Sequence, residues 1–191
     1  MEPIEIIAQI AGLFGMAFNV FSYQQKKQRN LIICQLFGAS FFFINFLLLG
    51  IADGVLLIGA VMNLIGIVRS IIFSNKEKFR VDKRIWKQIW LVGFIASYVI
   101  SYALTFTVFG TVWNLRNAVL ELLPVIGMTA GTVAYFKTEA KVTRKLGFIS
   151  SPSWLVYDIF NLSIGGIITE ALSLVSIVVG IVRHDIKKKE N

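Results

Sequence analysis

The chain has 191 residues, of which 56% are hydrophobic and only 16% charged, and its mean hydropathy is +0.72. Soluble domains are about 45–50% apolar and about a quarter charged, whereas here the apolar excess recurs in blocks of roughly 20 residues, enough to cross about 30 Å of hydrocarbon. This composition excludes a soluble enzyme, a disordered chain and a disulfide-stapled secreted domain. It predicts an all-α membrane protein.

Apolar runs between polar breaks predict seven transmembrane helices in chain order. They cover residues 4–23, 31–49, 53–73, 88–108, 118–136, 146–161 and 165–184. We treat 1–191 as a single membrane domain, with a first three-helix unit over 4–73, a basic loop and linker helix over 74–110, a second three-helix unit over 118–184 and a basic tail over 185–191. Glu2 and Glu5 leave the N-terminus without the basic region of a cleavable signal, so we expect the first span to be retained.

The placement of the basic residues predicts the orientation. Eighteen of the 19 lysines and arginines end or follow the first, third, fifth and seventh predicted helices, and only Arg116 falls on the other side. Because cytoplasmic loops carry the excess of positive charge, we expect the N-terminus outside and the C-terminus in the cytoplasm. The net charge of +8 is explained in this way, so we expect the lipid bilayer, and no nucleic acid, as a partner.

Two short patterns recur at nearly constant separation. Tyr23 lies seven residues after Met16 and Tyr135 seven residues after Met128, so both members of the pair recur at one separation, which we call the repeat register. The tetrapeptide GIVR recurs at 66–69 and 180–183, a separation two residues larger. We therefore expect two three-helix repeats. The predicted helix over 88–108 lies between them and makes the repeats parallel, a 3+1+3 layout like that of the SWEET carriers.

Three segments carry a family resemblance. ELLPVIG at 121–127, SIGGIITE at 163–170 and the pattern from Met62 to Arg69 resemble the YgjV-like bacterial inner-membrane proteins over nearly the whole chain. The resemblance implies localisation in the inner membrane, and the 3+1+3 layout implies kinship with the SWEET/PQ-loop superfamily. SWEET-like carriers have hinge prolines in the helices of both repeats, whereas in this chain only the second repeat has them, Pro124 and Pro152.

Polar residues within the spans are the candidates for function. In SWEET-like proteins the third helix of each repeat contributes an asparagine to a midplane solute pocket, which implies Asn63 in the first repeat and, more weakly, Ser176 in the second. The alternative is that such residues only form hydrogen bonds between helices and add packing specificity.

A second candidate group lies toward the outer end. Asn45 and Asp158 occupy corresponding places in the two repeats, and Trp154 and Tyr157 lie close to Asp158 in sequence. Asp158 and Glu170 could bind a proton, a cation or a polyol hydroxyl in an outer vestibule; alternatively, both acids only cap helix ends in the wet interface. We read Glu121, which precedes Pro124, as the start signal of the fifth helix.

These observations favour a transporter or facilitator of a small polar solute, sugar-like or another metabolite, held between the two repeats. The alternative is a non-transporting receptor or accessory subunit on the same scaffold, whose basic face engages anionic lipids or a partner protein. Cys34 is the single cysteine and cannot form a disulfide within the chain. No spacing is typical of a catalytic or metal site, so we expect no enzyme activity and no cofactor. An oligomer is compatible with the sequence.

Overall fold

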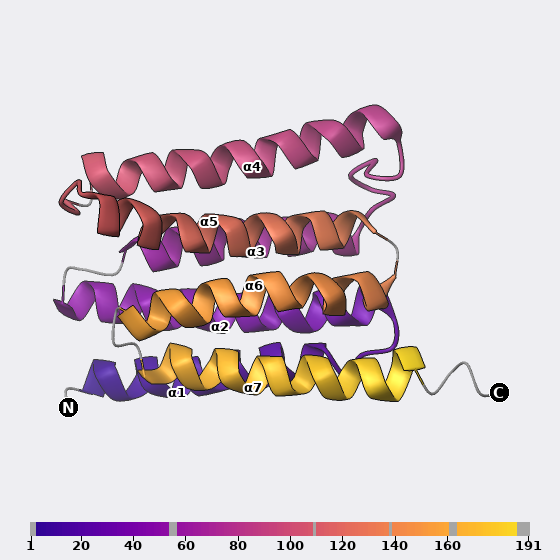
Figure 1. Ribbon diagram of the computed structural model, residues 1–191, viewed down its shortest axis with the longest axis horizontal. Helices are drawn as coiled ribbons and strands as arrows, with labels where there is room; N and C mark the ends of the chain where they lie inside the picture. Colours follow the sequence, from indigo (N-terminus) through magenta and orange to yellow (C-terminus); the bar gives the residue numbers. More distant parts are fainter. Residues whose placement is uncertain (1–2, 54–56, 109, 138, 161–163, 187–191) are drawn as a thin grey trace.

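A computed structural model describes residues 3–53, 57–108, 110–137, 139–160 and 164–186. These residues form seven α-helices, and a short π-helical turn, Val182–Ile186, continues the last of them (Figure 1). The helices are α1 Pro3–Ser22, α2 Gln28–Asp53, α3 Leu57–Ser74, α4 Arg84–Thr107, α5 Leu115–Phe136, α6 Ala140–Phe160 and α7 Ile164–Ile181. The predicted all-α class and the predicted seven helices are confirmed.

Five of these helices are long and apolar enough to cross a membrane within the described chain: α1, α2, α4, α5 and α7. The apolar part of α3 is shorter, and α6 carries Lys141, Arg144 and Lys145 in its first two turns. The prediction that all seven helices have the length and composition of a span is thus confirmed for five.

Four of the helices begin earlier in the chain than predicted. α2, α4, α5 and α6 begin three to six residues earlier than predicted, because a polar first turn can be helical without adding to the apolar pattern. The Asn114 side chain caps α5 by accepting a hydrogen bond from the Asn117 backbone amide at 2.8 Å. Glu121 and Pro124 therefore lie inside α5 rather than at its start, which corrects the predicted start signal.

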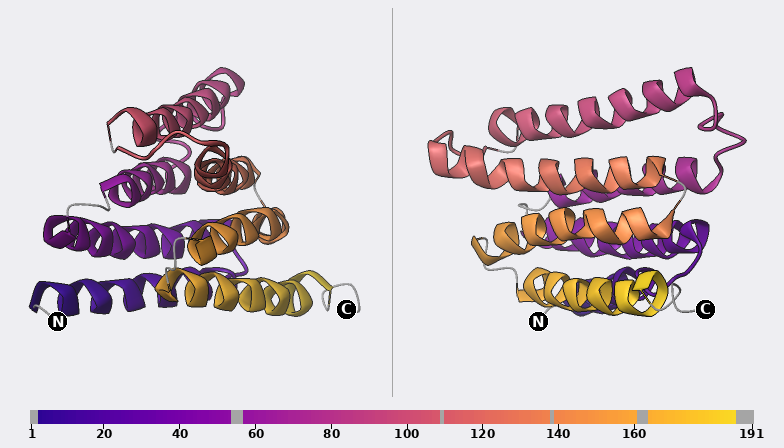
Figure 2. Two further views of the ribbon diagram at one scale, coloured as in Figure 1. Left: turned by 60° about the vertical axis from the view of Figure 1, so that its left-hand side comes forward. Right: turned by 45° about the vertical axis from the view of Figure 1, so that its right-hand side comes forward.

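The helices form two columns that stand against each other (Figures 1 and 2). In one column α2 packs between α1 and α3, and in the other α6 packs between α5 and α7. Across the columns α1 meets α7, α2 meets α6 and α3 meets α5, while α4 packs on α3 and α5. Large apolar side chains such as Leu13, Val92 and Val175 cover the outer surface, as expected where lipid is the solvent.

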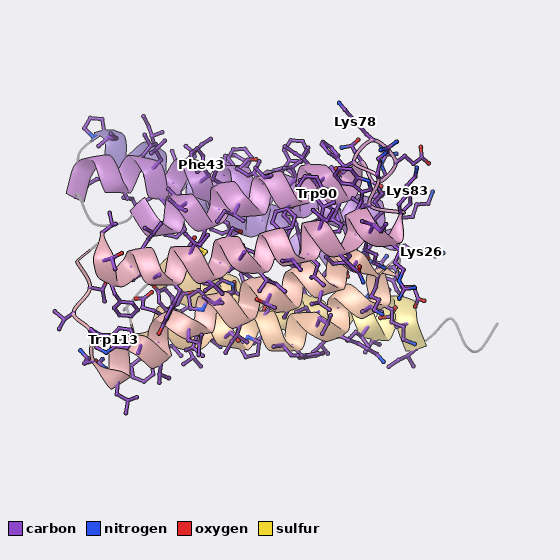
Figure 3. All side chains as sticks on the ribbon, turned by 90° about the horizontal axis from the view of Figure 1, so that it is seen from above. Lys26, Phe43, Lys78, Lys83, Trp90 and Trp113 are labelled. Carbon is purple, nitrogen blue, oxygen red and sulfur yellow. The ribbon has the colours of Figure 1, made fainter. Side chains whose placement is uncertain are left out.

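The two ends of the bundle differ in charge. Lys26, Lys78 and Lys83 lie at one end and Trp113 lies at the other (Figure 3). α1 begins at the Trp113 end, and α7 ends at the lysine end (Figures 1 and 3). The basic loops therefore share one end of the molecule, as the sequence predicts; the side of the membrane that this end faces stays a prediction.

Candidate functional site

Four of the predicted site residues gather where α6 meets α5 and α7. They are Trp154, Tyr157, Asp158 and Glu170. The Trp154 and Tyr157 rings meet edge to face with centroids 6.0 Å apart, and the Tyr157 hydroxyl donates to Glu121 Oε2 at 3.5 Å. Asp158 and Glu170 are close enough to interact electrostatically. The expected pair of carboxylates is thus joined by a third acid, Glu121.

The other three predicted residues have separate partners. Asn45 is buried and donates to the Ala8 carbonyl of α1 at 2.8 Å. Ser176 is also buried, and its hydroxyl donates to the Val20 carbonyl at 2.6 Å. Asn63 donates at 2.9 Å to a carbonyl one turn earlier in its own helix. Ser176 therefore makes the interhelical hydrogen bond that we weighed as its alternative, and Asn45 makes one as well. The solute role of Asn63 stays a prediction.

Arg69 is a buried cation between α3, α4 and α5. Its side chain is 9% exposed, and Nη1 donates to the Met128 carbonyl at 3.1 Å and to Thr132 Oγ1 at 3.2 Å. The guanidinium lies 4.6 Å from the centroid of the Tyr135 ring, and Nη1 is 3.5 Å from the Tyr98 hydroxyl. We predicted Arg69 within the third helix, as one of the basic residues that end or follow it; the structure places it in α3, and its burial was not predicted.

Among the residues that the structure describes, the charge of Arg69 has no opposite charge beside it. Within the described part of the chain, no carboxylate lies at ion-pair distance from the Arg69 guanidinium, and its Nε atom is buried without a hydrogen-bond partner. A buried charge without a counter-ion costs several kcal/mol. An ionisable residue buried within an apolar helix is a candidate functional residue for that reason.

Two buried tyrosines connect Arg69 to Glu170. Tyr135 and Tyr23 are 1% and 6% exposed. Tyr23 interacts with the hydroxyl of Ser151 and is within electrostatic range of Glu170, Arg69 and Tyr135. Ser151 also interacts with the Glu170 carboxylate. We call these five residues, Tyr23, Arg69, Tyr135, Ser151 and Glu170, the central polar cluster. It links residues of α3, α5, α6 and α7, and its two tyrosines lie toward the basic end, because Tyr23 directly follows α1 and Tyr135 is the next-to-last residue of α5.

A cavity of about 1000 Å³ opens to solvent at the basic end. We call it the basic vestibule. Its basic lining residues are Lys26, Lys27, Arg29, Lys76, Lys78, Lys141 and Arg144. Its acidic lining residues are Glu77, Glu139 and Asp185. A concave surface with this excess of positive charge raises the local concentration of anions.

The pKa of Lys76, which lines the vestibule, is affected by its surroundings. Partial burial, together with the nearby positive charge of Lys87, lowers the pKa of the Lys76 ammonium below its ordinary value. Lys76 therefore holds its proton less firmly than an exposed lysine does. A bound anion would offset both effects and favour the charged form of Lys76.

An ion pair in the vestibule lining connects α6 to the end of α7. Arg144 Nε donates to Asp185 at 2.9 Å, and the two side chains are 2% and 6% exposed. Arg144 Nη1 also donates to the Gln25 carbonyl at 3.0 Å, and His184 Nε2 lies 2.9 Å from the Gln24 carbonyl. The segment after α1 is thus tied to α6 and to the end of α7.

Four residues of the central polar cluster were not predicted as site residues from the sequence: Tyr23, Arg69, Tyr135 and Ser151. Tyr23 and Tyr135 were noted only as markers of the repeat. Arg69 was noted as a basic residue that ends the first GIVR copy and the family pattern from Met62 to Arg69. The signal that could have found Arg69 is its position within helix α3, five residues before the helix ends at Ser74. Ser151 carries no such signal because a serine in an apolar helix is common.

The helices with apolar outer surfaces and one strongly basic end define a helical membrane protein. The Imp-YgjV family model, described as bacterial inner membrane protein, matches residues 6–188. The chain therefore belongs to the Imp-YgjV family of bacterial inner membrane proteins. It matches no curated protein and no solved structure.

Proposed function

We propose that the protein is a transporter or facilitator of a small polar solute, and that the central polar cluster is its solute site. The observation that carries the proposal is the Arg69 guanidinium, which is buried without a carboxylate partner in the described chain and stacks on Tyr135. Buried polar groups that converge between helices are typical of ligand sites in bundles. The cost of such a group at membrane depth is offset where a ligand supplies the missing interaction.

The helix arrangement supports a 3+1+3 repeat. A two-fold axis along the membrane normal, passing between α2 and α6, would exchange α1 with α5 and α3 with α7. Such an axis would make the α1–α7 contact equivalent to the α3–α5 contact and would leave α4 outside the repeats. Both contacts are present, and α4 packs on α3 and α5 at the edge of the bundle (Figure 2). Parallel repeats of this kind occur in the SWEET carriers, with the solute site between them. We therefore extend the proposal to kinship with the SWEET/PQ-loop superfamily.

Side-chain packing adds support at the repeat register, the separation that takes Tyr23 to Tyr135. A Cβ atom on Gly15 would lie 3.1 Å from the Phe42 ring, and one on Gly127 would lie 2.9 Å from the Trp154 indole. The same register takes Gly15 to Gly127 and Phe42 to Trp154. The first two helices of each half therefore approach each other at equivalent positions. Trp154 is in this respect a packing partner of α5, a role that is compatible with lining the site.

The buried tyrosines make equivalent contacts as well. The Tyr135 hydroxyl donates to Gln35 Oε1 of α2, and the Tyr23 ring lies beside Gly147 of α6, where a Cβ atom would be 3.4 Å away. The repeat register also takes Gln35 to Gly147. Each tyrosine thus crosses from its own half to the middle helix of the other half. This is the contact expected of groups that bind a solute between repeats.

In this proposal the basic vestibule opens to the cytoplasm and the N-terminus lies outside, as the positive-inside rule predicts. Asp158 and Glu170 then lie on the outer side of the cluster, because α6 ends at Phe160 and α7 begins at Ile164. A solute would meet the acids from one side and the basic vestibule from the other.

A second candidate function is a non-transporting receptor or accessory subunit. It is favoured by Asn63, whose amide is bonded to its own helix rather than directed to a partner. In this alternative the basic vestibule binds lipid headgroups or a partner protein, and the central cluster is a structural network. Solute flux across the membrane separates the two functions.

The test is uptake into proteoliposomes across a panel of sugars, polyols, nucleosides, organic acids and phosphate esters. We expect uptake of one class, and we expect Y23F and Y135F to lower it at least about fivefold while the yield of folded protein is retained. Y102F is the matched control, because the Tyr102 hydroxyl donates to the Ala118 carbonyl at 3.2 Å, outside the cluster. Folded protein that moves no class of solute would favour the receptor function.

A further inference from the structure

We infer that the solute is an anion with a carboxylate or phosphate group, which enters through the basic vestibule and pairs with Arg69. This inference rests on the proposed function and names its substrate class. It requires three properties of the molecule: an unpaired cation in the cluster, a path between the cluster and the vestibule, and a vestibule that collects anions.

The first property is the unpaired cation. Arg69 uses Nη1 for its protein hydrogen bonds, to Met128, Thr132 and Tyr98, and Nε remains without a partner. A guanidinium binds carboxylate and phosphate through two parallel N–H donors, one of which can be Nε. Glu170, the acid of the central polar cluster, does not neutralise Arg69, because the described chain has no ion pair between them. Arg69 thus retains an unused donor and an uncompensated charge.

The second property is the path. Phe73 lines the vestibule and lies one helical turn after Arg69, about 6 Å along the axis of α3. The Phe73 ring is 5.7 Å from the Tyr135 ring, on which the Arg69 guanidinium stacks at 4.6 Å. The Phe73 ring therefore connects the lining of the vestibule with the aromatic ring on which Arg69 stacks. Movement of the Phe73 ring would bring an anion in the vestibule to the guanidinium.

The third property is the vestibule itself. Its volume of about 1000 Å³ is at the upper end of the range for small-molecule sites, about 300–1,000 Å³. Seven lysine and arginine side chains line it against three carboxylates. The positive-inside rule explains exposed loop charges such as Lys78. It does not explain Arg69, because the Arg69 side chain is buried against α5 rather than exposed in a loop.

Arg69 could instead serve only to fasten α3 to α5 through Met128 and Thr132. The two roles differ in what they predict for ligands. A purely structural arginine affects the unfolding temperature but leaves the response to added anions unchanged. If Arg69 forms an anion site, the change in unfolding temperature on adding an anion depends on the residue at position 69.

The experiment measures binding and transport separately, on the full-length protein. Thermal unfolding in detergent is followed with inorganic phosphate, acetate, citrate, sorbitol and choline as added solutes, since a ligand that binds the folded state raises the unfolding temperature. We expect saturable stabilisation by at least one of the anions and none by sorbitol or choline. We expect R69M to weaken the binding of that anion at least about tenfold, because the loss of a charge-assisted hydrogen bond changes an affinity by about this factor.

Two further variants keep the test decisive if R69M does not fold. R69K retains the charge but loses the planar pair of donors, and we expect it to weaken binding less than R69M does. K26Q/K27Q removes two vestibule charges, and we expect it to lower affinity and flatten its salt dependence. The matched control is K83Q/R84Q, which removes two exposed basic residues that do not line the vestibule.

The outcomes separate this inference from the proposed function. Uptake of a neutral solute that is insensitive to R69M would overturn the inference and leave the transporter intact. Anion binding that depends on Arg69 without any flux would support the inference and overturn the transporter. Stabilisation only in nanodiscs of equimolar phosphatidylcholine and phosphatidylglycerol, and not in phosphatidylcholine alone or by soluble anions, would assign the vestibule to lipid and overturn the inference.

Discussion

The two copies of GIVR offer a matched pair of substitutions, G180A and G66A. A Cβ atom on Gly180 would lie 2.5 Å from the Tyr23 carbonyl oxygen and 2.9 Å from Arg144 Cδ. The same atom on Gly66 would find only ordinary contacts, 3.8 Å from Ala39 and 3.9 Å from Met128. The two variants add the same methyl group to the same tetrapeptide, and only one of them has room for it.

The expected magnitudes have opposite signs. At position 180 the clash is with backbone that cannot rotate away, and overpacking of this kind costs about 1–3 kcal/mol. At position 66 alanine gains helix propensity, up to about 1 kcal/mol relative to glycine. We therefore expect G180A to lower and G66A to raise or preserve the stability of the folded protein.

The assay is unfolding of the purified protein in detergent, followed by tryptophan fluorescence against temperature and repeated by steric trapping in bicelles. Equal effects of the two variants, or a stabilising G180A, would refute the claim that α7 touches the segment after α1. The contact of Tyr23 with the second half of the chain would then be wrong as well.

Two other predictions concern the basic vestibule. D185A leaves Arg144 buried without its counter-ion, so we expect a loss of about 3–5 kcal/mol of stability, whereas R144L/D185L recovers most of it; equal unfolding temperatures for the single and double variants would contradict the ion pair. The lowered pKa of Lys76 means that its charge is lost at a lower pH than that of an ordinary lysine. We therefore expect anion uptake to fall as pH rises through that lowered pKa, and K76Q to remove this part of the pH profile measured as initial rates. The lowered pKa also makes the folded protein less stable at a pH below the lowered pKa of Lys76 than at a pH above the ordinary pKa of lysine, and we expect K76Q to remove this difference in stability. If the pH profile of uptake is unchanged in K76Q, another group causes the pH dependence.

The all-helical class and the seven helices could be predicted because apolar length is a strong and local signal. The starts of α1 and α7 were predicted to within one residue. The starts of α4 and α6 could not be predicted, because their polar first turns carry lysine and arginine where the apolar pattern ends. Pro124 shows the same limit: a proline suggests a first turn, but α5 begins at Leu115 and continues through it.

The site was predictable in part. Asp158, Tyr157 and Glu170 were found because acids and aromatics in apolar helices stand out, and the structure gathers them with Glu121. Arg69 was missed because an arginine near the end of an apolar run fits the positive-inside rule equally well. Its burial depends on α5, which lies far later in the chain and presents Met128 and Thr132 to it.

If the two halves are repeats, their divergence supplies the chemistry of the proposed site. Arg69 and Arg183 end the two copies of GIVR, yet Arg69 is buried against α5 while Arg183 is exposed. In the second half the contact of α7 with α1 is made instead by Ser176, whose hydroxyl donates to the Val20 carbonyl. The acid of the cluster, Glu170, belongs to the second half alone. The repeat would thus place two tyrosines symmetrically, while a cation from one half and an acid from the other give the site a direction along which a charged solute can be oriented.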